Sequence, residues 1–387
     1  MVGAGIAGLA TAIALARRGI ASTILERRHL VDEEGAGIQI GPNGCKALAA
    51  LGLLDQLTDV AGHPGAIHLR DGATGRIQAS LPLGAAIRAR HGAPYLVAHR
   101  ADLHGLLLAR TRNLPTVRIE TGWDVEVLAR HPDGRYQITS SDGRGEIASV
   151  LIGADGLWSA VRRFAFPSLA TRPRATGLSA MRTVVQTPPD ALPHHADINA
   201  WMMPGSHVVL YPLRLGSETA IVVIAPLASE GEGWAFSVDR QSVMTALAHY
   251  PPEVRDLAAR GTAWRRHQVH RLDALPALGI ERIALVGDAA HPMAPYLAQG
   301  AVMALEDALV LADAIARHGP TAMALAEFSR ARTRRVRRVV RRSRFNGFVY
   351  HQSRPISVAR NLVLRNTSGA RLLAGLDWLY GWQPDAV

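Results

Sequence analysis

The stretch GAGIAG at residues 3–8 decides the fold of this chain of 387 residues. Its glycines, Gly3, Gly5 and Gly8, follow the spacing G-x-G-x-x-G. Glycines at this spacing let the backbone turn tightly, approach a pyrophosphate and pack a helix closely against a strand. Because such a triplet also arises by chance in a chain rich in alanine and glycine, the segments that follow it carry the argument.

Those segments complete a dinucleotide-binding pattern. Residues 9–18 (LATAIALARR) predict a helix, and residues 22–26 (STILE) predict a strand that ends in Glu26. The free N–H groups of a helix N-terminus favour a phosphate. Glu26 lies 18 residues after the last glycine, where an acid can accept hydrogen bonds from ribose hydroxyls.

The strand that should precede the glycines is short. Only Met1 and Val2 come before Gly3, whereas a strand has about five residues on average. The sequence therefore predicts either a clipped first strand or further residues before Met1.

Two later apolar runs end in a carboxylate and predict buried parallel strands. They are VLIGADG, which ends in Asp155 and Gly156, and RIALVGD, which ends in Gly287 and Asp288. Doubly wound sheets bind ligands at the carboxyl ends of their strands, so we expect both acids near one ligand. A helix is predicted over residues 299–316, shortly after the second run.

The middle of the chain has a different pattern. Residues 176–225 contain short alternating apolar runs separated by proline and glycine, which predict an antiparallel sheet. His207 and Tyr211 lie in the run HVVLY, four residues apart, so their side chains share one face of a strand. Two interpretations stay open: a proton relay that faces a bound phenol, or a polar face against a neighbouring strand.

The composition limits the other classes of function. Aromatic residues make up only 5% of the chain, so stacking platforms for nucleic-acid bases would be scarce. Cys45 is the only cysteine, which excludes an intrachain disulfide. His194 and His195 lie in a proline-rich loop, and no H-E-x-x-H or similar spacing occurs, so we expect no metal. No apolar run is long enough for stable membrane insertion, and we expect a cytoplasmic protein.

The net charge of +11 comes from one segment. Residues 328–376 contain 13 arginines and no Asp or Glu, which leaves −2 for the rest of the chain. Within residues 331–348, Val336, Val339 and Val340 follow helical spacing and leave the arginines on the other faces. We expect a solvated helix face; the alternative is a surface that steers anions such as carboxylates or nucleotide phosphates.

Four motifs in order resemble the single-component FAD-dependent aromatic hydroxylases, the group A flavoprotein monooxygenases. They are GAGIAG, Arg100 in HRADLHGLL, the pair Asp155-Gly156, and GDAAHPMAPYLAQGAVMALEDA. The most similar branch comprises salicylate hydroxylase, 3-hydroxybenzoate 6-hydroxylase and 6-hydroxynicotinate 3-monooxygenase. The resemblance extends to GAGIQIGPN at 35–43 and DWLYGW at 377–382.

This resemblance implies an α/β fold, α+β overall. A Rossmann-like FAD-binding domain of the para-hydroxybenzoate hydroxylase type would carry an inserted antiparallel-sheet substrate domain and C-terminal helices. We expect a discontinuous FAD-binding domain of residues 1–65, 95–172 and 273–328. Residues 66–94 and 173–272 would form the substrate domain, and residues 329–387 a basic C-terminal helical segment.

The resemblance also assigns residues to a tightly but non-covalently bound FAD. They are Gly3, Gly5, Gly8, Glu26, Arg100, Asp155, Gly156, Gly287, Asp288, Pro295, Gly300 and Ala301. Glu26 would hold the adenosine ribose, Asp288 would accept from a ribityl hydroxyl, and the helix from Gln299 would point its positive end at the flavin. NADH or NADPH would be a transient co-substrate, since no second glycine unit is present.

Catalysis would rest on His207, Tyr211 and Gln299. The implied reaction uses O₂ and a flavin hydroperoxide to hydroxylate a small aromatic acid of the salicylate, 3-hydroxybenzoate or 6-hydroxynicotinate type. His207, with an ordinary pKa near ~6.5, suits a base that removes the phenolic proton. Tyr211 and Gln299 would orient the substrate. No nucleic-acid partner is expected, and the resemblance allows for a homodimer.

Three other functions stay open. A flavin dehydrogenase or oxidase of amines or alcohols would turn over without NAD(P)H. An epoxidising monooxygenase shares the flavin motifs, and only the pair His207 and Tyr211 argues against it. A basic binding protein with a relic flavin fold would be colourless and would bind DNA with a steep salt dependence.

Overall fold

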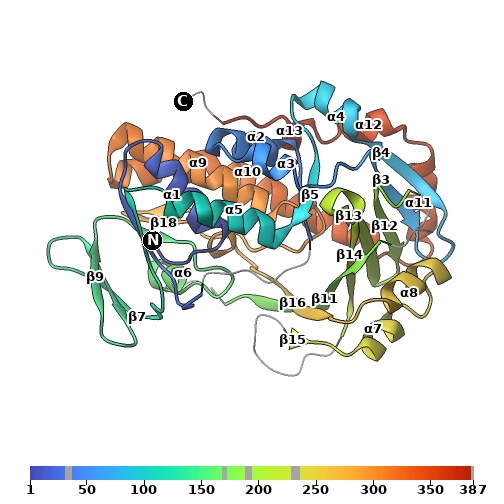
Figure 1. Cartoon of the computed structure of the whole chain (residues 1–387), viewed down its shortest axis with the longest axis horizontal. Helices are drawn as coiled ribbons and strands as arrows, with labels where there is room; N and C mark the ends of the chain where they lie inside the picture. Colours follow the sequence, from blue (N-terminus) through green and yellow to red (C-terminus); the bar gives the residue numbers. More distant parts are fainter. Residues whose placement is uncertain (31–36, 168–171, 188–193, 228–235, 385–387) are drawn as a thin grey trace.

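The two ends of the molecule are built differently (Figure 1). The computed structural model describes residues 1–30, 37–167, 172–187, 194–227 and 236–384. Helices and short strands form the end that contains the N-terminus, and a large sheet forms the other end. None of the helices in these described ranges is long and apolar enough to cross a membrane.

Short parallel strand pairs organise the N-terminal end. They are β1 (Ser22–Leu25) with β6 (Val117–Glu120), and β10 (Leu151–Gly153) with β18 (Ile283–Leu285). Val2 lies between the two pairs and bridges Leu25 and Gly153 in parallel. Its N–H donates to Ile152 O at 2.8 Å. Val2 therefore takes the central place in the sheet, between β1 and β10.

The helix after the glycines begins earlier than predicted. Helix α1 spans Ile6–Ala16, with Gly5 in an extended conformation at its N-cap. The predicted helix began at residue 9, three residues later. The helix starts at Ile6 because each residue from Ile6 onward can be buried or favours helix. The predicted helix over 299–316 is α9 (Gly300–His318), which ends where Gly319 adopts φ +66°.

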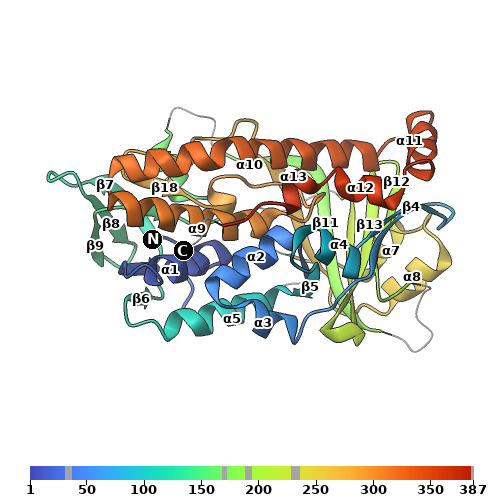
Figure 2. The ribbon, with the colours of Figure 1, turned by 90° about the horizontal axis from the view of Figure 1, so that it is seen from above.

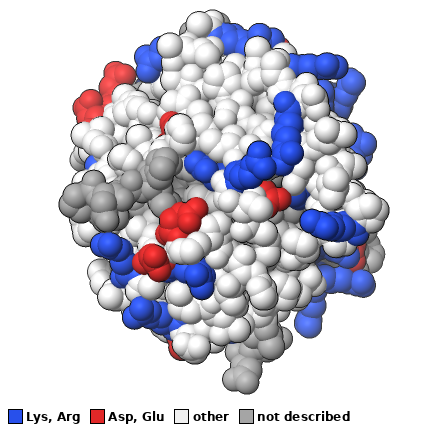
Figure 3. Space-filling model, turned by 90° about the vertical axis from the view of Figure 1, so that its right-hand side faces the viewer, with Lys and Arg blue, Asp and Glu red and all other residues white. Residues whose placement is uncertain are grey.

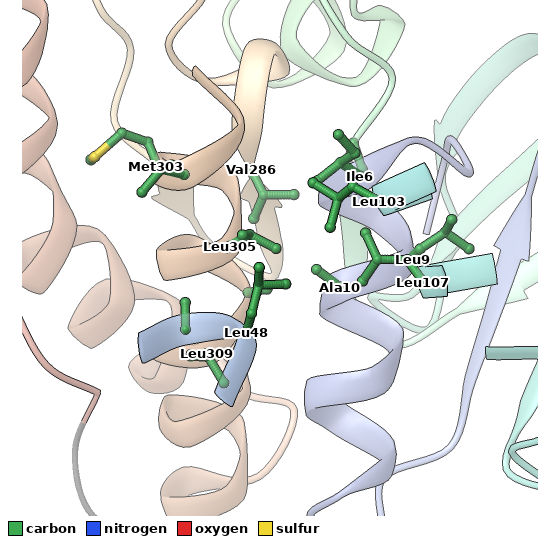
Figure 4. Packing of buried hydrophobic residues seen from close by; sticks show 14 of the residues in the cluster. Ile6, Leu9, Ala10, Leu48, Leu103, Leu107, Val286, Met303, Leu305 and Leu309 are labelled. Carbon is green, nitrogen blue, oxygen red and sulfur yellow. The ribbon is translucent and has the colours of Figure 1, made fainter. Parts of the chain in front are cut away.

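Helices α1, α9 and α5 (Arg100–Arg112) form the core of this end (Figure 4). Ile6, Leu9 and Ala10 of α1 face Leu305 of α9 and Leu107 of α5, and all five are buried. Full burial of each large aliphatic side chain contributes roughly 2 kcal/mol to stability. This core holds the N-terminus of α1 and the N-terminus of α9 in fixed positions.

An eight-stranded sheet forms the other end, in the order β15-β16-β11-β14-β13-β12-β3-β4. Its strands are β3 (Ala66–Asp71), β4 (Ile77–Pro82), β11 (Arg174–Gln186), β12 (Ile198–Met203), β13 (Ser206–Leu213), β14 (Glu218–Pro226), β15 (Phe236–Ser237) and β16 (Arg265–Arg271). All neighbours pair antiparallel except β12 with β3. The antiparallel sheet predicted for residues 176–225 is confirmed.

The sheet has two faces with different surroundings. Val208 and Leu210 of β13 point to the outer face, which packs on α7 (Arg240–Ala246) and α8 (Pro252–Ala259). The alternate residues His207 and Tyr211 point to the inner face, whose apolar side chains join the main core with the helical end.

Helix α10 (Ala322–Tyr350) runs the length of the molecule beside α9, and α11 (Ile356–Arg365) follows it at the sheet end (Figure 2). The buried face of α10 carries Val336, Val339 and Val340, as predicted. It also carries Arg332, which is 1% exposed. The prediction that all arginines lie on the other faces is therefore wrong, because buried acids on α9 compensate Arg332.

The other described elements complete both ends. They are β2 (Gly37–Ile40), α2 (Pro42–Leu51), α3 (Leu54–Thr58), α4 (Gly84–His91), β5 (Leu96–His99), β7 (Val125–Arg130), β8 (Tyr136–Ser140), β9 (Gly145–Ala148), α6 (Ala160–Ala165), η1 (Arg214–Gly216), β17 (Gly279–Ile280), η2 (Gly287–Ala289), α12 (Gly369–Ala374) and α13 (Asp377–Tyr380). On the sheet end, more basic than acidic side chains are visible (Figure 3).

Candidate functional site

The three N-terminal glycines form a cradle at the start of α1. A Cβ atom on Gly8 would lie 2.0 Å from Gly3 O, and one on Gly3 would lie 2.5 Å from Ala154 O. A Cβ atom on Gly5 would meet nothing within 4 Å, so space is open in front of this residue. The first turn of α1 contains no acidic residue. Its free N–H groups are therefore suited to an anion.

Glu26 closes one side of the cradle. Its Oε2 accepts from Ala4 N at 2.7 Å, and its Oε1 accepts from Arg28 N at 3.0 Å. Burial raises the pKa of this carboxyl, but the backbone hydrogen bonds and the Arg28 guanidinium outweigh it, so the pKa lies below its ordinary value. An ionised carboxylate thus stands beside the glycines.

Asp155 and Gly156 follow β10 directly, next to the cradle. The Asp155 carboxylate accepts from Ser159 Oγ and, at 3.1 Å, from Val161 N. It therefore caps α6 as well as lying near the glycines. Burial raises the pKa of Asp155. Gly156 has φ +72°, a backbone conformation that favours glycine.

Gly287 and Asp288 lie in the turn η2 after β18. A Cβ atom on Gly287 would be 2.9 Å from Ala7 Cβ, so this glycine lets the turn approach α1. Arg162 of α6 donates to Ala289 O at 2.7 Å and to Asp288 O at 3.3 Å. This buried arginine joins the two acid-tipped loops. Sequence reasoning missed it, because nothing in AVRRFA distinguishes Arg162 from its exposed neighbour.

The N-terminus of α9 offers a second cradle. Gly300 begins the helix and has open space at its Cβ position, and Ala301 follows it half-buried. Gln299 is 2% exposed, and its Oε1 accepts from Asn43 Nδ2 at 2.9 Å. Its Nε2 group has no partner among the described residues, so it can donate to a ligand. Pro295 is half-buried in the preceding loop.

His207 is buried on the inner face of the sheet. Its Nδ1 lies 2.8 Å from Nε2 of His351, which follows α10. The rings of Tyr296 and Tyr350 lie 5.4 and 5.6 Å from the His207 ring. Burial and His351 lower the pKa of His207 to about 3, and burial lowers that of His351 to about 4. The surroundings of His207 therefore move its pKa well below the ordinary value near ~6.5 that the sequence suggested.

Tyr211 shares the inner face but not the same partner. Its hydroxyl donates to Gly37 O at 2.7 Å, and burial raises its pKa to about 12. Gly37 belongs to the motif GAGIQIGPN, of which residues 35 and 36 lie outside the described ranges. The tyrosine stays protonated, and its oxygen can only accept one further hydrogen bond.

A group of basic side chains lies beside Tyr211. Arg182 occupies the inner face of β11, and its buried Nε has no hydrogen-bond partner in the described ranges. Arg100, at the start of α5, lies close enough to lower the pKa of both Arg182 and His267. Burial is the larger cause for both residues, and the pKa of His267 falls to about 4. Sequence reasoning missed Arg182, although a lone arginine at an inward position of an alternating strand was a visible signal.

His291 belongs to a buried ionic network rather than to the sheet face. Its Nε2 lies 2.6 Å from Asp307 Oδ2, which also accepts from Gly287 N at 3.0 Å. Arg332 donates to Asp307 at 2.8 Å and to Glu306 at 2.6 Å. Burial raises the pKa of Asp307, but His291 and Arg332 outweigh it and lower it to about 2. The network fixes the loop after Gly287 against α9 and α10.

Comparison with known proteins agrees with this geometry. Residues 1–343 match the model of a family described as FAD binding domain. The chain is 36% identical to 3-hydroxybenzoate 6-hydroxylase of Klebsiella oxytoca and 35% identical to 3-amino-4-hydroxybenzoate 2-monooxygenase PtnB3 of Streptomyces platensis. Both matches cover 100% of this chain and 96% of the relative.

A solved structure has the same fold. It is Klebsiella pneumoniae HpxO complexed with FAD and uric acid, with a TM-score of 0.86 and 26% identity. The match covers 98% of this chain and 96% of that one. The α/β fold with a Rossmann-like FAD-binding part and an antiparallel sheet is thereby confirmed. This chain belongs to the FAD-binding-domain family and is an FAD-dependent monooxygenase of the aromatic hydroxylase type.

Proposed function

We propose that this chain hydroxylates a small aromatic acid that carries a ring hydroxyl, with NAD(P)H and O₂ as co-substrates. The observation that carries the proposal is the buried His207, whose Nδ1 is engaged by His351 so that Nε2 is left for a ligand. The named substrates of the two relatives, 3-hydroxybenzoate and 3-amino-4-hydroxybenzoate, both combine a hydroxyl with a carboxylate. A buried ring nitrogen suits the hydroxyl of such a ring.

The glycine cradle and the α9 N-terminus fit FAD. Open space at Gly5 and Gly300, with no acid in either first turn, leaves both helix N-termini free for the cofactor. Bound FAD supplies the redox and oxygen-transfer chemistry. The residues assigned to hold it are Gly3, Gly5, Gly8, Glu26, Arg100, Asp155, Gly156, Gly287, Asp288, Pro295, Gly300 and Ala301.

His207 acts as the base. When its Nδ1–H donates to His351 Nε2, its own Nε2 carries a lone pair that can take the phenolic proton. In the other tautomer, Nε2 would carry a hydrogen and could not accept one. Loss of the phenolic proton raises the electron density of the ring and favours attack by an electrophilic oxygen. We therefore assign His351 as the positioning residue that selects the active tautomer.

The groups beside His207 contact two parts of the substrate, its ring and its carboxylate. Tyr211 uses its hydrogen on Gly37 O, so it leaves the single phenolic hydrogen to His207 and orients the substrate ring beside it. Gln299 has a free Nε2 donor, and Arg182 carries the positive charge that a carboxylate needs. A bound carboxylate also favours the protonated imidazole, so it would bring the pKa of His207 back toward neutrality.

The domain division predicted from the sequence is part of this proposal. We assign residues 1–65, 95–172 and 273–328 to FAD binding, and residues 66–94 and 173–272 to the substrate domain. The pairing of β3 with β12 supports the second assignment, because it joins residues from both segments in one sheet. We assign residues 329–387 to the C-terminal segment, whose α10 contacts α9 and whose α11 and α12 contact β4.

The test is the variant His207→Ala, measured with 3-hydroxybenzoate and related aromatic acids. We expect hydroxylated product to fall roughly 100-fold while FAD absorbance is retained. The matched control is His270→Ala, a half-buried histidine of β16 that hydrogen-bonds to Gln268 O and contacts the Trp158 ring. Unchanged product formation in His207→Ala would overturn the assigned role. Turnover without NAD(P)H would favour a dehydrogenase or oxidase instead.

A further inference from the structure

Three side chains that can ligate a metal meet where β3 and β12 pair. His68 lies on β3, and His194 and Asp197 lie in the turn before β12. Their ligand atoms all lie within 4.8 Å of one another. Asp197 Oδ2 is 3.0 Å from His68 Nε2 and 3.8 Å from His194 Nδ1. Ligand atoms around a tetrahedral zinc ion are about 3.3 Å apart, which lies between these two distances.

This group is separate from the candidate flavin site. His68 pairs in register with Asn199, which pairs in turn with Leu210. Leu210 points to the outer face of the sheet, where it packs in the smaller core with α7 and α8. His207 and Tyr211 point to the inner face, so the two sites are on opposite sides of the sheet.

Two of the three ligands are oriented by further hydrogen bonds. His68 Nδ1 lies 2.8 Å from Ser80 Oγ, which leaves Nε2 directed at Asp197. Asp197 Oδ1 accepts from Gly65 N at 2.8 Å and from Ala66 N at 2.9 Å, which leaves Oδ2 for the histidines. Metal-binding histidines are normally held through their other ring nitrogen in this way.

The third ligand is held by its backbone. His194 has φ +63°, a left-handed conformation that is uncommon for residues other than glycine. Its carbonyl accepts from Asp197 N at 3.0 Å and from Asn199 Nδ2 at 2.9 Å. These bonds keep the ring of His194 against that of His68, with centroids 4.5 Å apart. A strained backbone maintained by its surroundings is a frequent property of ligand sites.

We propose that His68, His194 and Asp197 bind a divalent transition-metal ion of the Zn²⁺ class. Two imidazoles and one carboxylate suit such an ion better than Mg²⁺ or Ca²⁺, which prefer oxygen ligands. Because His194 is exposed, a fourth position is open to water. The ion would fix the turn before β12 to β3. The sequence predicted no metal, because ligands at 68, 194 and 197 form no short motif.

The test is metal binding to the FAD-saturated full chain, made without an affinity tag and treated with a chelator. Calorimetric titration with Zn²⁺ should give one tight site per chain. His194→Ala should weaken that site at least tenfold, while His195→Ala, the exposed neighbour outside the group, should leave it unchanged. Since His194 is exposed, its variant should keep normal FAD absorbance.

Two further measurements separate a built site from weak binding to scattered histidines. Ser80→Ala removes only the partner of His68 Nδ1 and should weaken binding about 10–100-fold. Co²⁺ should give the visible absorption bands of tetrahedral coordination in the wild type and lose them in Asp197→Asn. Equal Zn²⁺ affinity in the wild type and His194→Ala, or no tight site at all, would overturn the proposal. Product formation by His195→Ala is measured as well. It reports on the active site separately from metal binding, because His195 belongs to neither site.

Discussion

The two faces of helix α10 carry the same residue type in opposite roles. On the buried face, Arg332 and Arg335 bind the carboxylates of Glu306 and Asp307. On the exposed face, another set of arginines lines a groove beside Asp273 and makes no hydrogen bond or ion pair within the described ranges. This set is Arg330, Arg334, Arg337 and Arg341.

The buried face continues beyond the ion pairs toward the candidate base. Ser343 Oγ donates to Ala294 O at 2.8 Å, in the loop before α9. Gly347 lies against Tyr296, and His351 meets His207. The buried face of α10 therefore connects the loop before α9 to the sheet. The difference shows that the position of a residue around the helix, rather than its type, decides which arginines and histidines of this segment make buried contacts.

The largest effect is expected at Arg332. Arg332→Met should lower the free energy of unfolding by about 3–5 kcal/mol, because it leaves two buried carboxylates short of positive charge. Denaturant unfolding measures this change. Arg334→Met, on the exposed face of the same helix, is the matched control and should stay within about 0.5 kcal/mol of the wild type. Equal losses would mean that the two faces do not differ.

The same variant should change acid stability. The folded pKa of Asp307 is about 2, below its unfolded value near ~3.9, so its stabilisation is present above about pH 4 and lost as the pH falls toward 2. Without Arg332 the folded pKa rises, so the ionised carboxylate contributes less stability above about pH 4 and less of it remains to be lost as the pH falls. The difference in unfolding free energy between Arg332→Met and Arg334→Met should therefore be largest near pH 6 and should shrink as the pH falls toward 3.

A smaller effect is expected where α10 packs on Tyr296. A Cβ atom at Gly347 would lie 2.5 Å from Tyr296 Cε2, so Gly347→Ala should destabilise the protein by about 1–3 kcal/mol. Gly105→Ala in α5, where nothing lies within 4 Å, should instead stabilise it by up to about 1 kcal/mol. Thermal unfolding of both variants measures the two signs. Stabilisation by Gly347→Ala would show that the contact with Tyr296 is loose.

His351 tests the catalytic end of the buried face. His351→Ala should lower kcat about tenfold with little change in KM, because the Nδ1 atom of His207 loses its partner. Removal of His351 also removes one cause of the low His207 pKa, so the acid limb of the kcat profile should move to higher pH. His351→Gln, whose amide oxygen can accept from Nδ1–H, should restore most of the rate. A purely structural role would leave the pH profile in place.

The smallest effect is expected on the exposed face. Reversing the charge of Arg334 and Arg337 to Glu should change the KM for NAD(P)H by less than about twofold and leave its salt dependence unaltered, because a solvated arginine face is screened. Steady-state kinetics over a range of salt concentrations measures this. A steep rise in KM at low salt would instead identify this face as the surface that steers anions.

Local patterns predicted much of the fold. The spacing of Gly3, Gly5 and Gly8 located the cradle, and alternation around His207 and Tyr211 located the antiparallel sheet and its inner face. Both depend on neighbours within a few residues, where the periodicity of a strand or helix decides which way a side chain points. The start of α1 could not be predicted in this way. Its residues are apolar on all sides, so their spacing does not show where the helix begins.

Contacts between distant residues could not be predicted. Arg332 is one of nine arginines within residues 330–344, and its acidic partners lie about 25 positions earlier on another helix. The contact of His351 with His207 spans 144 positions. Pairing across such distances depends on the packing of α10, which no short motif encodes. The roles assigned to the site residues stay predictions until the variants are measured.

The contact between His207 and His351 limits how this enzyme can be re-engineered. A chimaera that transplants the sheet into a relative brings His207 but leaves His351 behind, because His351 follows α10 and is not part of the sheet. Such a hybrid would bind its aromatic acid in a correct pocket and still hold the imidazole in an unselected tautomer. To exchange substrate preference between relatives, residues 343–351 should therefore be transferred together with the sheet.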